Sequence, residues 1–310
     1  MKNWTEDEIP PQTGKWAIVT GANSGIGYHT DLELARKGAA VVLACRNPAK
    51  ASDALARLMS AVPGAKAELA ALDLSDLKSV RAFGAAFAAR GVPLDLLINN
   101  AGVMAPLSRK ISPDGFELQM ATNHLGHFLL TSLLLPSLKR APAPRVVTVA
   151  SIAHRRGRMN FDDLQSERSY SPFASYAQTK LANLLFAFEF QRRLDKAGLK
   201  LLSVAAHPGV ARTSLVVNGI GGGRRTFLTR VIDLFSPLYM HSEARGALPS
   251  LYAATSPDAV PGGYYGPDGF REMTGFPVRV DCMPQAKDAA AAARLWDVSK
   301  TLTGADFSGL

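Results

Sequence analysis

A glycine-rich segment near the start of the chain, residues 20–27 with the sequence TGANSGIG, places the strongest limit on how the chain can fold. It follows a short apolar run, residues 16–20, of the kind that forms a buried parallel strand. It leads into residues 25–37, whose pattern predicts a helix that ends at Gly38. A strand, a tight turn and a helix in this order predict the start of a βαβ unit, in which the next strand lies parallel to the first.

Strand-like and helix-like segments alternate along the rest of the chain. We expect Asn47, followed by Pro48, to cap the second helix, and Ser75 to cap the third. Because no linker-like break interrupts the alternation, we predict a single α/β domain of the Rossmann type, with a doubly wound, mainly parallel, seven-stranded sheet and helices on both faces. The further strands are expected at residues 40–44, 68–72, 95–98, 145–149, 200–206 and 263–265, and the further helices at residues 48–59, 76–90, 115–139 and 175–196.

The composition of the 310 residues, with 47% hydrophobic and 20% charged side chains, is typical of a compact protein. Cys45 and Cys282 are too few for a disulfide framework and form no metal-ligand cluster, so we expect no metal site and a reducing, cytoplasmic compartment. The most apolar stretch, residues 125–138, is shorter than the roughly 20 residues that span a bilayer. We therefore expect a buried helix there and no transmembrane segment.

The net charge of +9 raises the question of nucleic-acid binding. Basic residues are scattered, apart from two clusters at residues 154–158 and at Arg224 and Arg225. Phosphate-backbone binding needs a continuous basic face, so we expect a solvated basic surface and no nucleic-acid partner. One interpretation of Asp31, early in the first helix, is a surface carboxylate that interacts favourably with the helix dipole, but the sequence assigns this residue no definite role.

The three glycines of the first turn suit a dinucleotide. Gly21 permits a tight turn, Gly25 lets the backbone approach a pyrophosphate, and Gly27 allows close packing of helix against strand. The N-terminus of the following helix adds unpaired N–H groups and a partial positive charge. We expect the ligand to lie outside the carboxyl ends of the strands, where these motifs gather.

The end of the second strand predicts which nucleotide binds. A carboxylate there would bind the ribose 2′-hydroxyl, but the chain has Cys45, Arg46 and Asn47 instead. The planar guanidinium of Arg46 suits a 2′-phosphate, so we expect NADP(H) in preference to NAD(H). Asp73, which ends the third strand, is expected to accept a hydrogen bond from the adenine amino group, although a turn or capping aspartate is the alternative.

The motifs named so far resemble those of short-chain dehydrogenases/reductases. TGANSGIG, NNAG at residues 99–102, Ser151, Tyr176 with Lys180, and Pro208 with Gly209 occur in the order seen in that family, and the similarity spans residues 14–303. Four segments are similar to its retinol-dehydrogenase-like branch: ACRN at 44–47, NHLGHFLLT at 123–131, ASIAHRRG at 150–157 and KLANLLF at 180–186. The resemblance implies an NADP(H)-dependent oxidoreductase that moves hydride between nicotinamide and a carbonyl or alcohol carbon.

Tyr176 and Lys180 are four residues apart on an expected helix, so their side chains share a face. A phenol has an ordinary pKa of about 10, and a nearby ammonium is expected to lower it so that Tyr176 can act as a general acid and base. The resemblance places Ser151 beside the substrate oxygen and implies that Asn123 holds a water in a proton relay with Lys180.

The resemblance also implies that the loop after the sixth strand borders the nicotinamide. Small residues at the end of the fourth strand are expected to lie close to the cofactor's ribose. The residues that we expect to contact the cofactor are Gly21, Asn23, Ser24, Gly25, Ile26, Gly27, Arg46, Asn47, Asp73, Leu74, Asn100, Ala101, Gly102, Tyr176, Lys180, Pro208, Gly209, Val210 and Thr213.

Several alternatives stay open at this point. Residues 214–241 combine glycines with an apolar run, which suits either a mobile lid over a lipophilic pocket or a plain packing helix. Residues 1–13 are expected to form an N-terminal arm and residues 284–310 a C-terminal extension, and the chain is expected to be a monomer or a homo-oligomer. The substrate is expected to be a small lipophilic carbonyl or alcohol.

A non-catalytic NADP(H)-binding sensor or scaffold is the alternative function. The intact set of Ser151, Tyr176 and Lys180 favours an enzyme, because a pure sensor needs only the phosphate loop. A serine hydrolase is disfavoured, because no Gly-x-Ser-x-Gly turn surrounds Ser151.

Overall fold

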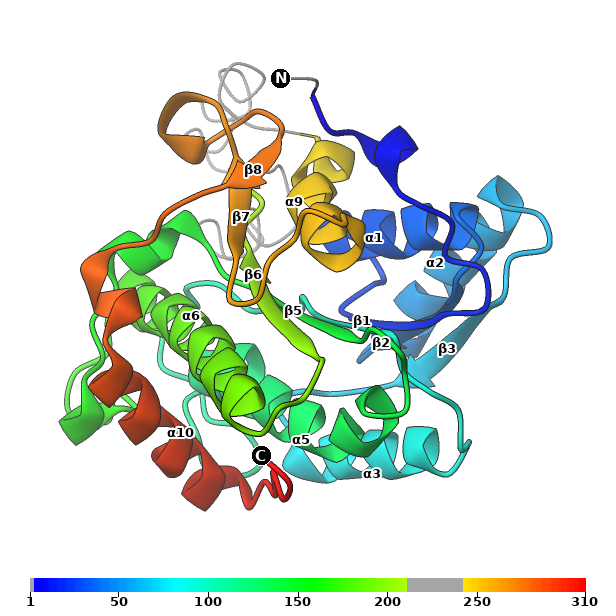
Figure 1. The fold of residues 1–310 in the computed structure, drawn as a ribbon. Helices are drawn as coiled ribbons and strands as arrows, with labels where there is room; N and C mark the ends of the chain where they lie inside the picture. Colours follow the sequence, from blue (N-terminus) through cyan, green and yellow to red (C-terminus); the bar gives the residue numbers. More distant parts are fainter. Residues whose placement is uncertain (1–2, 211–241) are drawn as a thin grey trace.

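One twisted sheet organises the protein, and its strand order is β3-β2-β1-β4-β5-β6-β7-β8 (Figure 1). The computed structural model describes residues 3–210 and 242–310. Neighbouring strands are parallel throughout, except that β8 runs antiparallel to β7. The strands are β1 Trp16–Thr20, β2 Ala40–Cys45, β3 Ala67–Ala71, β4 Leu96–Asn99, β5 Arg145–Val149, β6 Leu202–Ala206, β7 Tyr264–Pro267 and β8 Pro277–Arg279.

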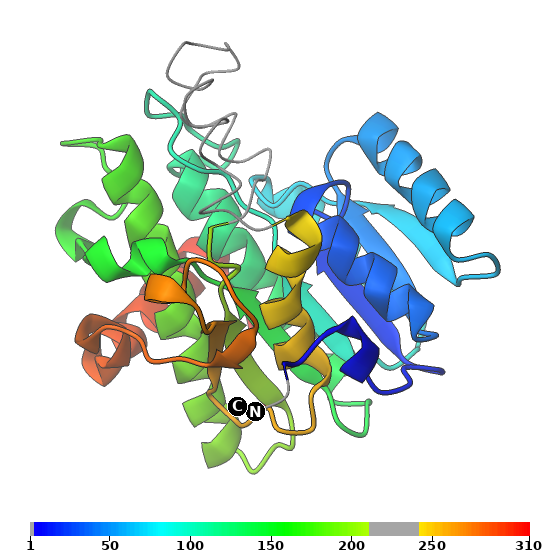
Figure 2. The same ribbon diagram turned by 90° about the horizontal axis from the view of Figure 1, so that it is seen from above.

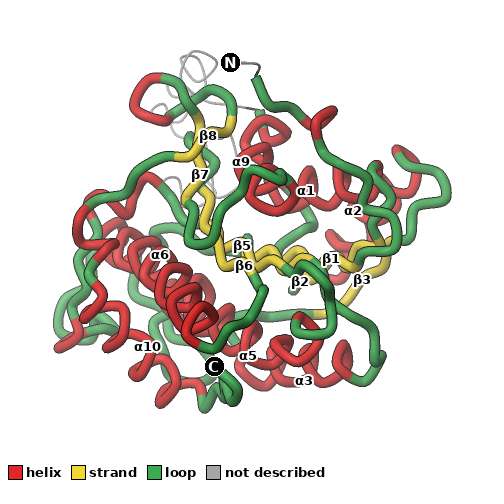
Figure 3. Tube along the Cα trace, in the orientation of Figure 1, coloured by secondary structure: helices red, strands yellow, loops and turns green. Residues whose placement is uncertain are grey.

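Helices cover both faces of this sheet (Figure 3). One face carries α1 (Gly25–Arg36), α2 (Pro48–Ala61) and α9 (Glu243–Thr255). The other face carries α3 (Leu77–Ala88), α5 (Gly126–Leu138) and α6 (Pro172–Lys196), and α10 (Ala289–Thr303) packs on the outer side of α6. This arrangement confirms the predicted Rossmann-type fold.

The sheet has eight strands where seven were expected. The additional strand, β8, has only three residues, Pro277, Val278 and Arg279, and pairs with β7 at the edge of the sheet. A run this short has no visible alternation of polar and apolar side chains, and its proline is tolerated because the strand lies at an edge. The sequence analysis also assigned no helix to α9 or α10.

The helix caps agree with expectation in one case and differ in the other. Asn47 caps α2, and its Oδ1 accepts a hydrogen bond from the backbone N–H of Lys50 at 3.0 Å. Ser75 does not cap α3: the cap is Asp76, whose Oδ1 accepts from the N–H of Lys78 at 2.9 Å. The Ser75 hydroxyl instead donates to Asp73 Oδ1 at 2.6 Å, so it is not free to cap the helix.

The long helix expected at residues 115–139 is divided in three. It begins with α4 (Leu118–Met120), capped by the Glu117 carboxylate, continues as a π-helix, η2 (Ala121–Leu125), and becomes α5. α5 is buried almost throughout, as its apolar sequence predicts. Within the described residues, no helix is both long enough and apolar enough to cross a membrane.

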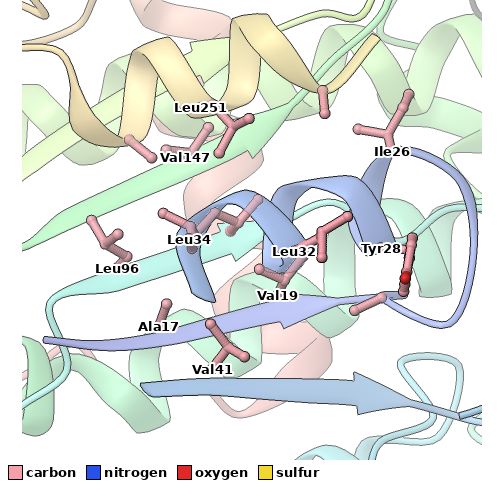
Figure 4. Packing of buried hydrophobic residues seen from close by; sticks show 14 of the residues in the cluster. Ala17, Val19, Ile26, Tyr28, Leu32, Leu34, Val41, Leu96, Val147 and Leu251 are labelled. Carbon is pink, nitrogen blue, oxygen red and sulfur yellow. The ribbon is translucent and has the colours of Figure 1, made fainter. Parts of the chain in front are cut away.

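Two apolar clusters hold the helices on the sheet. On the α1 side, Leu34 and Leu251 lie over Val19, Val41 and Val147 of the strands (Figure 4). These side chains are almost completely shielded from water, and burying each contributes about 1.5–3 kcal/mol. The strands and helices named here are therefore fixed by the same core.

Aromatic side chains dominate the cluster on the opposite face. Trp296 of α10 stacks on Phe186 of α6 at 6.0 Å between ring centroids and meets Phe128 of α5 edge-on at 5.1 Å. Phe307, beyond α10, lies 4.5 Å from the Trp296 ring. α10 and the residues that follow it therefore pack against the outer side of α6.

The N-terminal arm lies on the face that carries α1 and α9, as the view from above shows (Figure 2). Ile9 is 3% exposed and belongs to the core cluster of that face. The Trp4 ring meets Tyr252 of α9 edge-on at 5.3 Å. The arm therefore adds apolar cover to α9.

Asp31 is fully buried, so the interpretation of this residue as a surface carboxylate is wrong. Neither of its carboxylate oxygens has a hydrogen-bond partner among the described residues. Burial raises the pKa of the Cys45 thiol, and the charge of Asp31 raises it further. Asp31 therefore lies on the side of α1 that faces β2, the strand that carries Cys45. Burial without partners raises the pKa of Asp31 well above its usual range.

We expect Asp31→Ala to stabilise the fold by about 1–3 kcal/mol at pH 8, because it removes an unpaired buried polar group. The folded-state pKa lies above the unfolded value of about 3.9, so the folded state binds the proton more tightly and stability falls as pH rises between the two values. The stabilisation by Asp31→Ala should therefore be larger at pH 8 than at pH 5, as measured by the free energy of unfolding in urea.

The exposed Asp297 of α10 provides a matched control, and Asp297→Ala should change stability by less than about 0.5 kcal/mol. Loss of stability in Asp31→Ala at both pH values would show that this carboxyl is compensated in the folded protein.

Candidate active site

The carboxyl ends of the central strands open onto a cavity of about 1720 Å³. Turns that follow β1, β2, β3, β4, β5 and β6 all contribute to its wall, as does α6. The site residues expected from the sequence that line it are Gly21, Asn23, Ser24, Gly25, Ile26, Gly27, Arg46, Asn47, Asp73, Leu74, Asn100, Ala101, Gly102, Ser151, Tyr176, Lys180, Pro208, Gly209 and Val210. Thr213 and the lid expected at residues 214–241 lie outside the described residues.

The glycine-rich loop packs too closely for side chains. Gly21 has a φ of +70°, which favours glycine. A Cβ on Gly27 would lie 2.6 Å from Asn100 Nδ2 and 2.7 Å from the Gly21 carbonyl oxygen. This close approach lets the N-terminus of α1 sit directly at the cavity wall, where its free N–H groups suit an anion.

Thr20 joins the ends of β1 and β4 beneath that loop. Its Oγ1 accepts hydrogen bonds from the N–H groups of Asn100 and Ala101, both at 2.9 Å, and its carbonyl accepts from Asn100 Nδ2 at 2.7 Å. His127 Nε2 also lies 2.9 Å from Thr20 Oγ1. Burial lowers the pKa of His127 to about 4, so this histidine is neutral and part of the cavity's support.

Arg46 and Asp73 lie together at the end of the cavity formed by β2 and β3. Their side chains are 60% and 31% exposed, and Arg46 Nη1 is 3.9 Å from Asp73 Oδ2. Asp73 Oδ1 is held by the N–H and hydroxyl of Ser75 at 2.9 and 2.6 Å. Asp73 therefore both borders the cavity and organises a turn, so the two interpretations of this residue are compatible.

The sequence analysis missed two cations from α2 at the same end. Lys50 and Arg57 line the cavity, and the Arg57 guanidinium lies 4.3 Å from the centroid of the Tyr28 ring. Arg57 Nη2 also donates to the Asn23 carbonyl at 3.4 Å. Their spacing of seven residues, with Asp53 between them, places them on one helix face, and this pattern was the available signal.

The structure brings Ser151, Tyr176 and Lys180 together at the ends of β5 and α6. The Ser151 hydroxyl is close enough to Tyr176 to oppose the rise in the pKa of its phenol, and Lys180 Nζ lies 5.7 Å from the centroid of the Tyr176 ring. Lys180 Nζ donates to the Val149 carbonyl at 3.0 Å. Tyr176 and Lys180 are 8% and 4% exposed, so both groups act in a nearly dry environment.

The protonation of this pair differs from expectation. Burial raises the pKa of Tyr176 to about 12, against the opposing effect of the Ser151 hydrogen bond, and burial lowers that of Lys180 to about 8. The ammonium was expected to lower the phenol pKa. The loss of hydration is instead the largest cause of the shift in both groups, because both are buried.

Asn123 lies in the π-helix η2 and fastens the loop after β4. Its Oδ1 accepts from the Val103 N–H at 2.8 Å, and its Nδ2 donates to the Val103 carbonyl at 2.9 Å and to Thr179 Oγ1 at 3.0 Å. The side chain therefore ties this loop to α6 and is not itself in the cavity wall. Its expected part in a water relay stays a prediction.

The loop after β6 is held by a buried histidine. His207 Nε2 donates to Glu272 Oε2 at 3.0 Å, and its Nδ1 accepts from the Gly209 N–H at 3.2 Å. The Val210 N–H donates to the Met273 carbonyl at 2.9 Å. His207 is 0% exposed, so it belongs to the packing around the site.

Beyond Ser151 and Tyr176 the cavity wall has two kinds of side chain. One part is apolar, and its Leu107 and Phe173 side chains are conspicuously exposed, at 72% and 46%. The other part is cationic. The apolar members include Met104, Pro106, Leu107, Ile152, Phe173 and Met273, and the cationic members are Lys110, Arg155, Arg156 and Arg271. Across residues 3–210 and 242–310, no group of three or more His, Cys, Asp or Glu side chains could hold a metal ion.

Comparison with known proteins identifies this site's family. A family model described as short chain dehydrogenase matches residues 15–219. Human retinol dehydrogenase 12 is 42% identical over 293 residues, which cover 94% of this chain and 87% of that protein. Human retinol dehydrogenase 14 is 39% identical over 310 residues, with the same two shares covered.

A solved structure gives the same result at the level of the fold. The crystal structure of an uncharacterised protein from Mycobacterium paratuberculosis has a TM-score of 0.81 and 40% sequence identity, and 99% of each chain is covered. The glycine-rich loop, the Ser151, Tyr176 and Lys180 cluster, and these similarities agree. The chain is an oxidoreductase that belongs to the short-chain dehydrogenase family, in its retinol-dehydrogenase-like branch.

Proposed function

We propose that the protein is an NADP(H)-dependent carbonyl reductase, or the reverse alcohol dehydrogenase, that acts on a lipophilic substrate with Tyr176 as general acid and base. One observation carries this proposal: Ser151 and the buried Tyr176 and Lys180 side chains share a single cavity with the glycine-rich loop. A non-catalytic sensor would need the loop but not this set of buried polar groups.

The residues present fit a dinucleotide. The close packing of Gly27 against Asn100 leaves the N-terminus of α1 facing the cavity, which suits a pyrophosphate. At the β2 end, Arg46, Lys50 and Arg57 supply positive charge for the ribose 2′-phosphate of NADP(H). The bound nicotinamide supplies or accepts the hydride, and this chemistry belongs to the cofactor.

The protein's own part is proton transfer and orientation. With a pKa of about 12, Tyr176 carries its proton at neutral pH and can donate it to a carbonyl oxygen. The Ser151 hydroxyl, beside Tyr176 in the cavity wall, donates to the same oxygen and stabilises its developing negative charge. The charged form of Lys180 favours the phenolate that remains after the proton is transferred.

The remaining groups position these three. Asn123 ties the loop after β4 to Thr179 of α6, the residue that precedes Lys180. The apolar side chains of Met104, Leu107 and Phe173 favour a lipophilic substrate body. Tyr176 and Lys180 are almost fully buried, which limits the access of water to the proton donor.

We expect Tyr176→Phe to lower the rate of NADPH oxidation with aldehydes and ketones by about 10²–10⁴-fold, because the proton donor is lost while the ring is kept. NADPH binding, followed by calorimetry, should stay within about twofold of the wild type, since one hydrogen bond contributes little to the total. Tyr252→Phe in α9, remote from the cavity, is the matched control and should retain full activity.

Tight NADPH binding by the wild-type protein without turnover of any carbonyl compound or alcohol would support the sensor instead. Unchanged turnover in Tyr176→Phe would show that another group donates the proton.

We expect the wild-type kcat/KM to favour NADPH over NADH, and Arg46→Ala to lower the value for NADPH about tenfold while leaving that for NADH unchanged. The tenfold change corresponds to the lower end of the range of free energies for a hydrogen bond to a charged group, because Arg46 is largely exposed. Arg36→Ala, at the far end of α1, serves as the control for a general loss of charge. Preference of the wild type for NADH would contradict the assignment of Arg46.

A further inference from the structure

The substrate end of the cavity carries two arginines that no acidic side chain neutralises in the described part of the chain. Ser151 caps a short 3₁₀ helix, η3 (Ile152–Arg156), so the residues at the end of η3 project from the element that begins at the reacting centre. Arg156, at that end, is exposed and lines the cavity. The sequence analysis interpreted this basic cluster as solvated surface, but the structure places Arg156 in the cavity wall.

Arg155 has a different role from its neighbour. Its Nη2 forms an ion pair with Glu272 Oε1 at 2.7 Å, and its Nη1 donates to the Arg271 carbonyl at 3.3 Å. Glu272 also accepts from the buried His207. Arg155 is therefore neutralised, and it joins η3 to the turn at residues 270–273.

That turn has a strained backbone. Arg271 and Glu272 have φ values of 51° and 59°, in the left-handed region that side chains other than glycine rarely adopt. Each such residue costs about 1–3 kcal/mol and persists where the surroundings enforce it, which is common at ligand sites. Here the two bonds of Glu272 and the pairing of Val210 with Met273 enforce the turn.

The consequence of the strained turn is the position of Arg271. Its side chain is exposed and lines the same cavity as Arg156, Ser151 and Tyr176. Because Arg155 bonds to the Arg271 backbone, the turn and the end of η3 are adjacent, and two free guanidinium groups border one end of the cavity. The rise of a 3₁₀ helix, about 2 Å per residue, puts Arg156 roughly 10 Å along the chain from Ser151.

We propose that the substrate carries an oxyanionic group, a carboxylate or a phosphate ester, which binds to Arg156 and Arg271 while its carbonyl lies at Ser151 and Tyr176. Guanidinium groups bind both oxyanions through paired hydrogen bonds. The apolar side chains in the wall of the same cavity favour a hydrocarbon body. The substrate class is therefore an amphipathic aldehyde or ketone with an acidic end, and this inference rests on the proposed carbonyl reduction.

The test compares matched aldehydes under saturating NADPH: 9-oxononanoate, its methyl ester and the phosphate ester of 9-hydroxynonanal. We expect the wild type to have a kcat/KM for at least one anionic aldehyde about tenfold above that for the methyl ester, and the better anion identifies the oxyanion. This preference should shrink toward unity in Arg156→Met and in Arg271→Met. It should also shrink as ionic strength rises from about 0.05 to about 0.5 M, because exposed charges are screened.

Arg158→Met is the matched control, since Arg158 is an exposed arginine two residues from Arg156 that does not line the cavity. Its activity with all three aldehydes should equal that of the wild type. Equal or better turnover of the methyl ester by the wild type would overturn the inference and leave the proposed reductase intact. A preference for the anion that survives in both Arg156→Met and Arg271→Met would also overturn it.

A direct binding measurement separates this inference from the proposed function. If no carbonyl compound is turned over, the reductase proposal fails, and calorimetry of nonanoate with the NADPH-saturated protein decides the remaining question. Binding that weakens about tenfold in both variants, but not in Arg158→Met, would support an oxyanion site. Absence of binding, or equal binding by all the variants, would overturn it.

Discussion

The buried ammonium of Lys180 is the group on which the arrangement of the site depends. An ammonium removed from water is costly unless it is hydrogen-bonded, and the Val149 carbonyl at the end of β5 provides that bond. Asn183 donates to the same carbonyl at 3.1 Å, so two residues of α6 are fixed to the end of β5. This attachment sets where Tyr176, one turn earlier on α6, meets Ser151, which follows β5.

The rest of the fold supports this attachment from two sides. Within the sheet, Thr20 joins the ends of β1 and β4, and Asn123 ties the loop after β4 to α6, so the same hydrogen bonds connect the glycine-rich loop with the helix that carries Tyr176 and Lys180. On the outside, Trp296 of α10 packs against Phe186 and Phe190 of α6. A helix held between the sheet and α10 keeps its polar side chains in place, as a preorganised site requires.

The parts of this structure that the sequence predicts correctly are those governed by local patterns. Residues 20–27 combine strand, turn and helix signals within a few positions, and the structure has β1, the turn and α1 as expected. Tyr176 and Lys180 share a helix face by spacing alone. The parts that sequence reasoning missed depend on distant partners: Asp31 is buried by packing against β2, and β8 exists only as the edge partner of β7. Arg156 borders the cavity at the end of η3, which Arg155 joins to a turn more than a hundred residues later.

The most direct test of this account is the pH dependence of carbonyl reduction at saturating NADPH, compared between the wild type and Lys180→Arg. Burial lowers the pKa of Lys180 to about 8, so its ammonium is lost within the measurable range, whereas an arginine stays charged. We expect the wild-type kcat/KM to be constant below about pH 8 and to fall about tenfold per pH unit above it, while Lys180→Arg, normalised to its own value at pH 7, shows no such fall. A wild-type profile that stays flat to about pH 10, or the same fall in Lys180→Arg, would contradict the central role of the buried ammonium.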